Sequence, residues 1–196
     1  MKQFILTLAA VAFLLTACNN NTKKVEATSE DGKTTVSADV SQMQQVSEEM
    51  KKQSEELQKL PPLSLDELKA LLPEQLMTAK RTDFQTTSVT GAGLAHAEYK
   101  LNDSTELELN IYDCGGPGGA GIYNMQYMGM LNIQSESEGE YTKTIDFRGG
   151  KAFEHCDKPN NHCTITYFTG KRFLVSIEGH NVHPDGLKQA AGELKI

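Results

Sequence analysis

The sequence predicts an α+β protein built mainly on an antiparallel sheet of about seven strands, with helices packed on one face of the sheet. Apolar and polar residues alternate with a period of two in segments joined by short Asn-, Asp-, Ser- and Gly-rich turns. Segments with helical periodicity give the order helix, three strands, helix, four strands, helix. This order lacks the strict strand-helix alternation of doubly wound folds. We expect residues 63–196 to form a single globular domain.

The N-terminus has the pattern of an export signal. Lys2 provides a positive charge, and an apolar run follows over residues 4–15. A helix needs about 20 apolar residues to cross a bilayer, whereas the apolar region of a signal peptide needs only about 7 to 15. Residues 1–17 are therefore predicted to be a signal peptide and not a transmembrane helix.

The run ends in Leu15-Thr16-Ala17-Cys18, which resembles the lipobox of bacterial lipoproteins. The resemblance implies that Cys18 receives a diacylglyceryl thioether, that cleavage occurs before it, and that its new amine is acylated. Two or more acyl chains make a stable anchor, since each buried methylene contributes about 0.8 kcal/mol. The resemblance thus implies a cell-envelope protein that contacts the membrane through Cys18. In the sorting pattern of Gram-negative lipoproteins, an aspartate directly after the lipidated cysteine favours the inner membrane, so the resemblance with Asn19 at this position implies the outer membrane.

The net charge limits the possible partners. The chain carries 19 Lys and Arg against 26 Asp and Glu, and removal of Lys2 with the signal peptide leaves 18 − 26 = −8. An acidic chain is not expected to bind nucleic acid or to grip anionic lipid through basic residues. Residues 18–40 are mostly polar with scattered apolar residues, so we expect a lipid-anchored flexible tether there.

Residues 41–62 are predicted to form an amphipathic helix that ends at Pro61 and Pro62. Its apolar stripe allows two interpretations, a short coiled coil or a helix packed on its own domain, and fewer than three heptads favour the second. Ser64 and Glu67 have the spacing of a capping box for a second short helix before Pro73. The stripe consists of Met43, Val46, Met50, Leu57 and Leu60, with Gln53 at its one polar position.

The strands are predicted from alternation. One face of the pair at 94–101 and 105–112 is apolar, and the other is expected to be solvated. A final helix is predicted from Pro184 to Leu194. The solvated residues are His96, Glu98, Lys100, Glu106, Glu108 and Asn110. The further strands are 78–85, 141–147, 151–156, 163–168 and 172–178.

Residues 115–134 contain no charged residue. The second half of this segment is helix-like, and its apolar residues are spread around the helix, which indicates either burial or an exposed patch. The glycines before it lack the spacing of a phosphate-binding loop, so we interpret them as small residues that allow close packing against the sheet. The candidate docking surface for a partner is Ile122, Tyr123, Met125, Tyr127, Met128 and Met130.

The cysteines support two interpretations of the 155–163 hairpin. A turn at residues 158–161 places Cys156 opposite Cys163, and in an oxidising compartment these thiols form a disulfide. The alternative is a metal site, alone or with His180 and His183. Adjacent residues on a strand point to opposite faces, which disfavours convergence of all the ligands. Cys114 remains as a buried thiol. The alternative metal ligands are His155, Cys156, His162 and Cys163.

No catalytic motif is present, since the chain lacks GxSxG, HExxH, P-loop and CxxC sequences. No cofactor is therefore expected, and catalysis is the least favoured class. We expect a non-catalytic envelope lipoprotein whose α+β domain binds an envelope protein or another envelope component. The alternative is a metal-binding envelope protein that uses the 155–163 hairpin.

Overall fold

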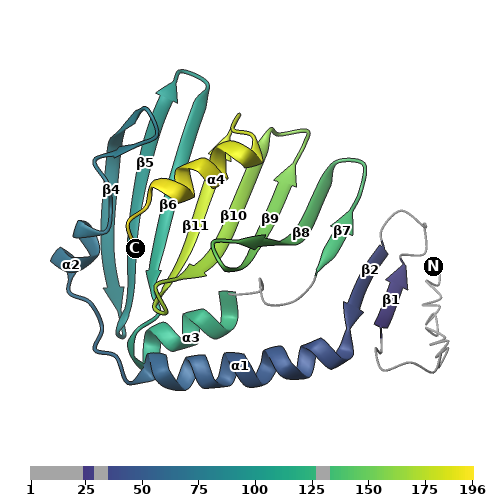
Figure 1. The fold of residues 1–196 in the computed structure, drawn as a ribbon. Coiled ribbons are helices and arrows are strands. Elements are labelled where there is room, and N and C mark those ends of the chain that lie inside the picture. The colour runs from purple at the N-terminus through teal and green to yellow at the C-terminus, as the bar shows by residue number, and fades with distance from the viewer. Residues whose placement is uncertain (1–23, 29–34, 127–132) are drawn as a thin grey trace, which may run out of the picture.

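The computed structural model describes residues 24–28, 35–126 and 133–196. The predicted signal peptide, Cys18, and three residues of the candidate docking surface lie outside these ranges. The fold class is confirmed: four helices accompany one large antiparallel sheet in the described part of the chain (Figure 1). The three docking-surface residues that lie outside the described ranges are Tyr127, Met128 and Met130.

The main sheet has nine strands in the spatial order β3-β4-β5-β6-β11-β10-β9-β8-β7, and every neighbouring pair is antiparallel. Two meanders meet where β6 pairs with β11 (Figure 1). The strands are β3 (Gln75–Leu76), β4 (Ala79–Val89), β5 (Ala92–Asn102), β6 (Thr105–Asp113), β7 (Gln134–Glu136), β8 (Glu140–Phe147), β9 (Gly150–Asp157), β10 (His162–Thr169) and β11 (Phe173–His180).

The seven predicted strands correspond to β4, β5, β6 and β8 to β11. The predicted count of seven is too low, because β3 and β7 add one short strand at each edge of the sheet. These strands have two and three residues. Alternation needs at least about four residues to be recognised, so neither strand leaves a readable pattern.

One face of the sheet is covered by α4 (Pro184–Glu193) and, near β4 and β5, by α2 (Leu65–Ala70). Figure 1 shows α4 crossing this face. The predicted start of α4 at Pro184 is confirmed, and Leu187, Ala190 and Ala191 on one side of the helix are buried. The capping box of α2 is present as well, with Ser64 and Glu67 bonded reciprocally. The alternating strand residues meet these helices in the main core, which includes Ala95, Ala97, Tyr99, Leu107, Leu109, Ile111, Ile165, Tyr167, Val175 and Ile177.

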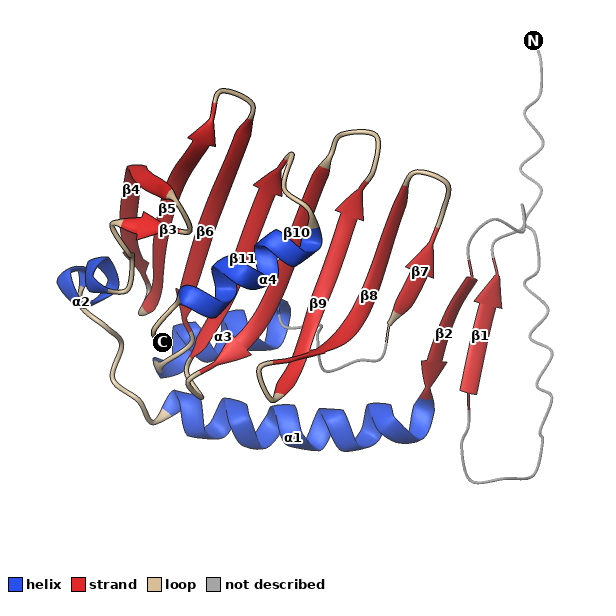
Figure 2. Cartoon of the chain, turned by 45° about the horizontal axis from the view of Figure 1, so that its top comes forward, coloured by secondary structure: helices blue, strands red, loops and turns tan. Residues whose placement is uncertain are grey.

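The other face is also partly covered, so the expectation of helices on one face only is wrong. α1 (Val40–Gln58) and α3 (Gly116–Gln126) run along one end of the sheet (Figure 2). Leu57 of α1 and Tyr123 of α3 are fully buried in a second core cluster. Strand residues that alternate with the main core join this cluster, namely Tyr112, Phe168 and Leu174. α1 thus packs on its own domain, as one of its two interpretations predicted.

Glycines set the position of α3 against the sheet. A Cβ on Gly118 would collide with the carbonyl oxygen of Thr90, and one on Gly119 with the carbonyl oxygen of Asp113. The predicted role of small residues in close packing is therefore confirmed. The helix begins at Gly116, within the glycine-rich first half of residues 115–134, which the sequence pattern did not predict to be helical. Close contact with the strand backbone outweighs the low helix propensity of glycine here.

The segment predicted to be a flexible tether contains two strands within its described residues. β1 (Lys24–Thr28) and β2 (Thr35–Asp39) pair antiparallel as a separate sheet. The register places Val25 opposite Ala38 and Ala27 opposite Val36. Each strand alternates a small apolar residue with a polar one, which is the period of a strand. In the described part of the chain, no helix is long and apolar enough to cross a membrane.

Candidate functional site

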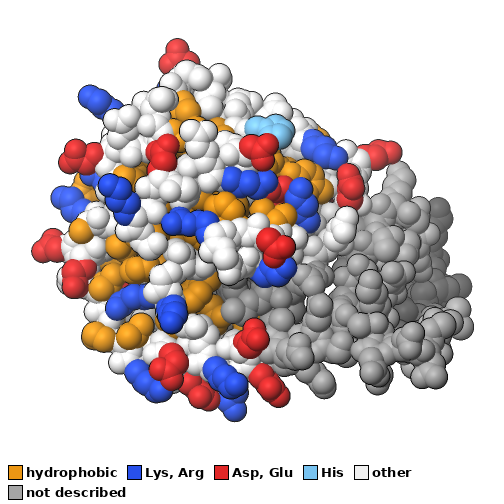
Figure 3. Space-filling model, viewed as in Figure 1, with side chains coloured by type: hydrophobic (Ala, Val, Ile, Leu, Met, Phe, Trp, Pro, Cys, Tyr) orange, Lys and Arg blue, Asp and Glu red, His pale blue; other side chains and the backbone are white. Residues whose placement is uncertain are grey.

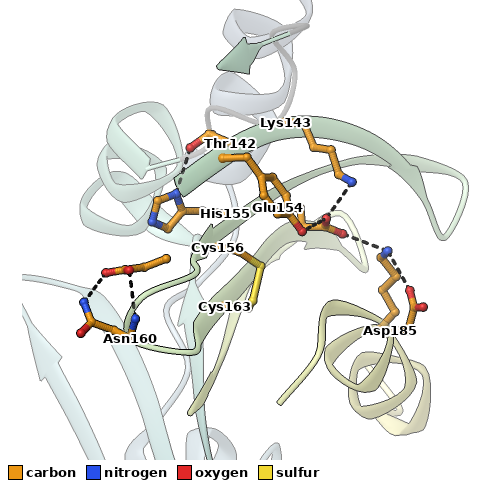
Figure 4. Close-up of a disulfide and its surroundings, with 11 residues drawn as sticks. Thr142, Lys143, Glu154, His155, Cys156, Asn160, Cys163 and Asp185 are labelled. Carbon is orange, nitrogen blue, oxygen red and sulfur yellow. Dashed lines mark hydrogen bonds and ion pairs between the residues drawn. A yellow bond between two sulfur atoms is a disulfide. The ribbon is translucent and has the colours of Figure 1, made fainter. Parts of the chain in front are cut away.

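The predicted disulfide is confirmed. Cys156 and Cys163 are directly opposite on β9 and β10 and are bonded to each other on the covered face (Figure 4). Both are nearly buried. Cys114 is a buried free thiol, as predicted. Burial raises the pKa of Cys114 to about 12, so it is protonated at neutral pH and is a poor nucleophile.

The alternative metal site is not assembled. The two cysteines are joined as a disulfide, and the histidines beside them point to the opposite face of the sheet. Figure 4 shows His155 turned away from the disulfide, with its Nδ1 bonded to Thr142 at 2.9 Å. His162 Nε2 lies 3.4 Å from Glu178. Within the described ranges, no group of three or more His, Cys, Asp and Glu side chains is arranged to hold a metal ion. His180 ends β11, and His183 is the exposed N-cap residue of α4.

The disulfide should stabilise the domain measurably. Cys156 and Cys163 are seven residues apart, and the chain-entropy relation gives about 2 to 2.5 kcal/mol for closing so short a loop. We expect the double variant Cys156→Ala, Cys163→Ala to lose about this much free energy of unfolding in urea, and either single variant to lose nearly as much. Cys114→Ala serves as the control for removing a thiol without a crosslink. An unchanged unfolding midpoint in the double variant would contradict the stabilising role.

The candidate docking surface is divided between core and surface. Tyr123 is fully buried, with its ring 4.8 Å from that of Phe168, and Ile122 is half-buried against the same cluster. Met125 is 79% exposed. Of the described members of this surface, Met125 offers the most area to a partner.

A second candidate lies on the sheet itself. Beyond the end occupied by α1 and α3, no described helix covers the side of the sheet opposite α4, and we call this side the open face. It is mostly polar, with Phe153 as an apolar residue between Thr144 and Thr166, and it includes four histidines. The residues that define it are His96, Glu98, Glu106, Glu108, Asn110, Thr142, His155, His162, Thr164, Thr166, Ser176, Glu178 and His180.

Strand register aligns four acidic residues on adjacent strands of the open face. Asp83 of β4 is opposite Glu98 of β5, Glu98 is opposite Glu108 of β6, and Glu108 is opposite Glu178 of β11. We call these four residues the carboxylate row. Among the residues that the structure describes, no lysine or arginine forms an ion pair with any of them. The row is therefore an uncompensated band of negative charge.

Two histidines lie beside the row, and each would carry a positive charge when protonated. His96 Nε2 lies 3.8 Å from Glu98, His96 Nδ1 lies 3.5 Å from Glu108, and His162 Nε2 lies 3.4 Å from Glu178. Asn110 bridges His96 and Glu108 through hydrogen-bond contacts of 3.0 and 2.9 Å. It is buried, so the expectation that it is solvated is wrong. The amide is held between two side-chain partners, and the residue is only 8% exposed.

The field of the row extends to a nearby phenol. Burial raises the pKa of Tyr112, and the negative charges of Glu178 and Glu108 raise it further. A hollow of about 290 Å³ lies over three members of the row, Glu98, Glu108 and Glu178, and opens to solvent. Its polar lining includes Glu98, Lys100, Glu106, Glu108, His162, Glu178 and His180. Such an arrangement suits the binding of positive charge.

The other side of the molecule has a different charge pattern. Figure 3 shows the side that carries α4, where acidic and basic side chains are interspersed. Lysines there compensate a carboxylate directly, since Lys143 and Lys188 lie 3.0 and 2.9 Å from Glu154. No protein-family model, no curated protein and no solved structure matches this chain.

Proposed function

We propose that this chain is a membrane-anchored envelope lipoprotein whose α+β domain is a non-catalytic binding module, with the open face as its binding surface. The observation that carries the proposal is the carboxylate row. Like charges directly opposite each other in a sheet are destabilising, by roughly 0.2 to 1 kcal/mol per pair. Three such pairs are retained between β4 and β11. Residues that work against stability are expected at functional sites.

The location of the helices supports this assignment. α2 and α4 close one face of the sheet, whereas the row and the hollow above it stay accessible. Glu98 is 58% exposed and Glu108 is 45% exposed as side chains. Solvated carboxylates of this kind are poorly suited to general-acid catalysis, which needs a group shielded from water. They are suited to binding.

The envelope location is supported by the lipobox resemblance and by the disulfide. Disulfides persist in oxidising compartments such as the periplasm and the cell surface, and are rare in the cytosol. The bond between Cys156 and Cys163 is what an exported chain is expected to carry.

Lipid anchoring is tested by changing the acceptor thiol. We expect Cys18→Ala to abolish labelling by a fatty-acid analogue and to leave the precursor unprocessed, because the thioether forms on the Cys18 sulfur. Cys114→Ala is the matched control and should be labelled normally, since its thiol is buried in the folded domain. Persistent labelling of the Cys18→Ala protein would refute the anchor.

The binding surface is tested by site-specific photo-crosslinking in intact envelopes. A photoreactive residue at Thr164 or Ser176 lies on the open face, and one at Gln189 or Gly192 lies on exposed positions of α4. We expect a discrete adduct with one envelope component from the open-face positions only. The same adducts from both sides, or none from the open face, would contradict the assignment.

A further inference from the structure

We infer that the open face binds an extended polypeptide segment rich in lysine and arginine. We infer also that protonation of His96 and His162 on the open face releases this segment. The inference rests on the proposed function, because it names the partner of the same surface. It is carried by charge complementarity between the carboxylate row and a cationic chain.

The dimensions of the row favour a partner with several positive charges. Neighbouring strands are about 4.8 Å apart, so four residues on four adjacent strands span roughly 14 Å. This exceeds the reach of one ammonium or guanidinium group. In an extended segment, side chains on one face recur about every 7 Å, so two or three basic residues would meet the row.

The surroundings of the row fit a polypeptide. Beside the carboxylates, Thr164, Thr166 and Ser176 present hydroxyl groups on adjacent strands. Thr166 and Ser176 are only half-buried and bond each other at 3.3 Å. Hydroxyl groups can both donate and accept, so they can pair with the main chain of an extended segment. α1 and α3 close one end of the face and limit the direction in which such a segment can lie.

His96 is placed to neutralise the row from within. It is in contact with Glu98, Glu108 and Asn110, and Gln85 lies opposite it on β4. Imidazole side chains as a class gain a proton between about pH 8 and 5. A charged His96 would pair with two carboxylates and compete with the basic residues of a partner.

His162 acts on the other end of the row. It is in contact with Glu178, while His180 and Asp157 lie opposite it on β11 and β9. Within the described residues, neither His162 nor His96 has a lysine or arginine at ion-pair distance from its carboxylate partners. Lys100, the nearest basic side chain of the hollow, is paired with Asp103 at 3.9 Å and lies opposite Glu106. When protonated, His96 and His162 are therefore the cations in contact with the row.

The first test measures the affinity of the full mature lipoprotein, in neutral detergent at low salt, for a fluorescent decalysine peptide. We expect binding at about pH 7.5, and at least about tenfold weaker binding for the triple variant Glu98→Gln, Glu108→Gln, Glu178→Gln, since three exposed ion pairs are lost. The matched control is Glu48→Gln, Glu49→Gln, Glu55→Gln, which changes the net charge equally at exposed positions of α1. An equal loss in the control would overturn the inference.

The second test uses pH. Wild-type affinity should fall at least about threefold between pH 7.5 and 5.5, while His96→Gln, His162→Gln should bind at pH 5.5 nearly as the wild type does at pH 7.5. Decalysine stays fully charged over this range. A pH-independent wild type would overturn the release mechanism.

The failure of this inference can be separated from failure of the proposed function. If decalysine does not bind but open-face crosslinks to an envelope component persist, the partner chemistry is wrong and the binding surface stands. If both are absent, both proposals are wrong. Circular dichroism of the triple variant checks that it is folded, and Glu178→Gln alone, with about a threefold loss expected, gives a milder second variant.

Discussion

Replacing Arg172 by methionine is expected to lower the free energy of unfolding by about 3 to 5 kcal/mol, because it leaves a buried carboxylate without its cation. Asp113, at the end of β6, is fully buried. The Arg172 guanidinium donates to both of its oxygens, from Nε to Oδ1 at 2.7 Å and from Nη2 to Oδ2 at 3.0 Å. This bidentate pair is the strong form of a charge-assisted bond.

The same pair organises three segments that are distant in sequence. Asp113 also accepts hydrogen bonds from the backbone N–H groups of Leu63 and Gly115, at 2.8 and 2.9 Å. Arg172 donates in addition to the carbonyl oxygen of Pro61 at 2.6 Å. The linker between α1 and α2, the start of α3 and the β10–β11 turn are therefore joined at one carboxylate. Loss of the guanidinium loosens all three.

The measurement is urea unfolding of Arg172→Met beside Lys171→Met, an exposed neighbour expected to change stability by less than about 0.5 kcal/mol. Asp113→Asn and the double variant complete a cycle, and the double variant should be less destabilised than the sum of the singles because the two residues act as a unit. A loss below about 1 kcal/mol in Arg172→Met would show that the pair is not a structural centre.

Local patterns were sufficient to predict most strands and three helices, α1, α2 and α4. Alternation located β4 to β6 and β8 to β11, and Pro184 marked the start of α4. The disulfide was predictable for the same reason. In a hairpin, the turn fixes the register, and the turn at residues 158–161 sets Cys156 opposite Cys163.

The carboxylate row could not be predicted, because it depends on the pairing of distant strands. Alternation shows that Glu98 and Glu108 are on solvated faces, but only the pairing of β6 with β11 brings Glu178 into line with them. The sequence contains no local signal for that pairing. The same holds for Asp113 and Arg172, which are 59 residues apart. The glycine-rich start of α3 was missed because contact with the sheet, and not helix propensity, decides its conformation.

The double variant Lys143→Met, Lys188→Met is expected to lose about 3 to 5 kcal/mol of unfolding free energy at neutral pH, because it leaves a second buried carboxylate without a cation. Glu154 is only 1% exposed, on the covered face beneath α4. Lys143 lies 3.0 Å from its Oε1 and Lys188 lies 2.9 Å from its Oε2, as Figure 4 shows in part. Removing Glu154 instead should cost less, because both lysines are partly exposed and can be solvated by water.

The dependence on pH distinguishes this mechanism from a loss of packing. Burial alone would raise the pKa of Glu154, but hydrogen bonds from Lys188, Lys143 and Tyr141 outweigh burial and hold the pKa below its ordinary value. In the wild type, the charged carboxylate therefore stabilises the fold above about pH 4.5, and this contribution is lost as pH falls through the lowered pKa. Without the lysines, burial dominates and the sign reverses, so the double variant should recover stability relative to wild type on acidification.

A third substitution provides the decisive comparison. Adding Glu154→Gln to the double variant removes the unpaired buried charge. It keeps an oxygen that can accept from the Tyr141 hydroxyl, which lies 2.9 Å from Glu154. We expect it to restore more than half of the lost stability at neutral pH and to abolish the recovery in acid. Lys51→Met, Lys52→Met changes the net charge equally at exposed positions of α1 and should be nearly neutral. If Glu154→Gln restores nothing, the lysines contribute through their packed alkyl chains, since only a penalty for an unpaired buried charge can be relieved by removing that charge.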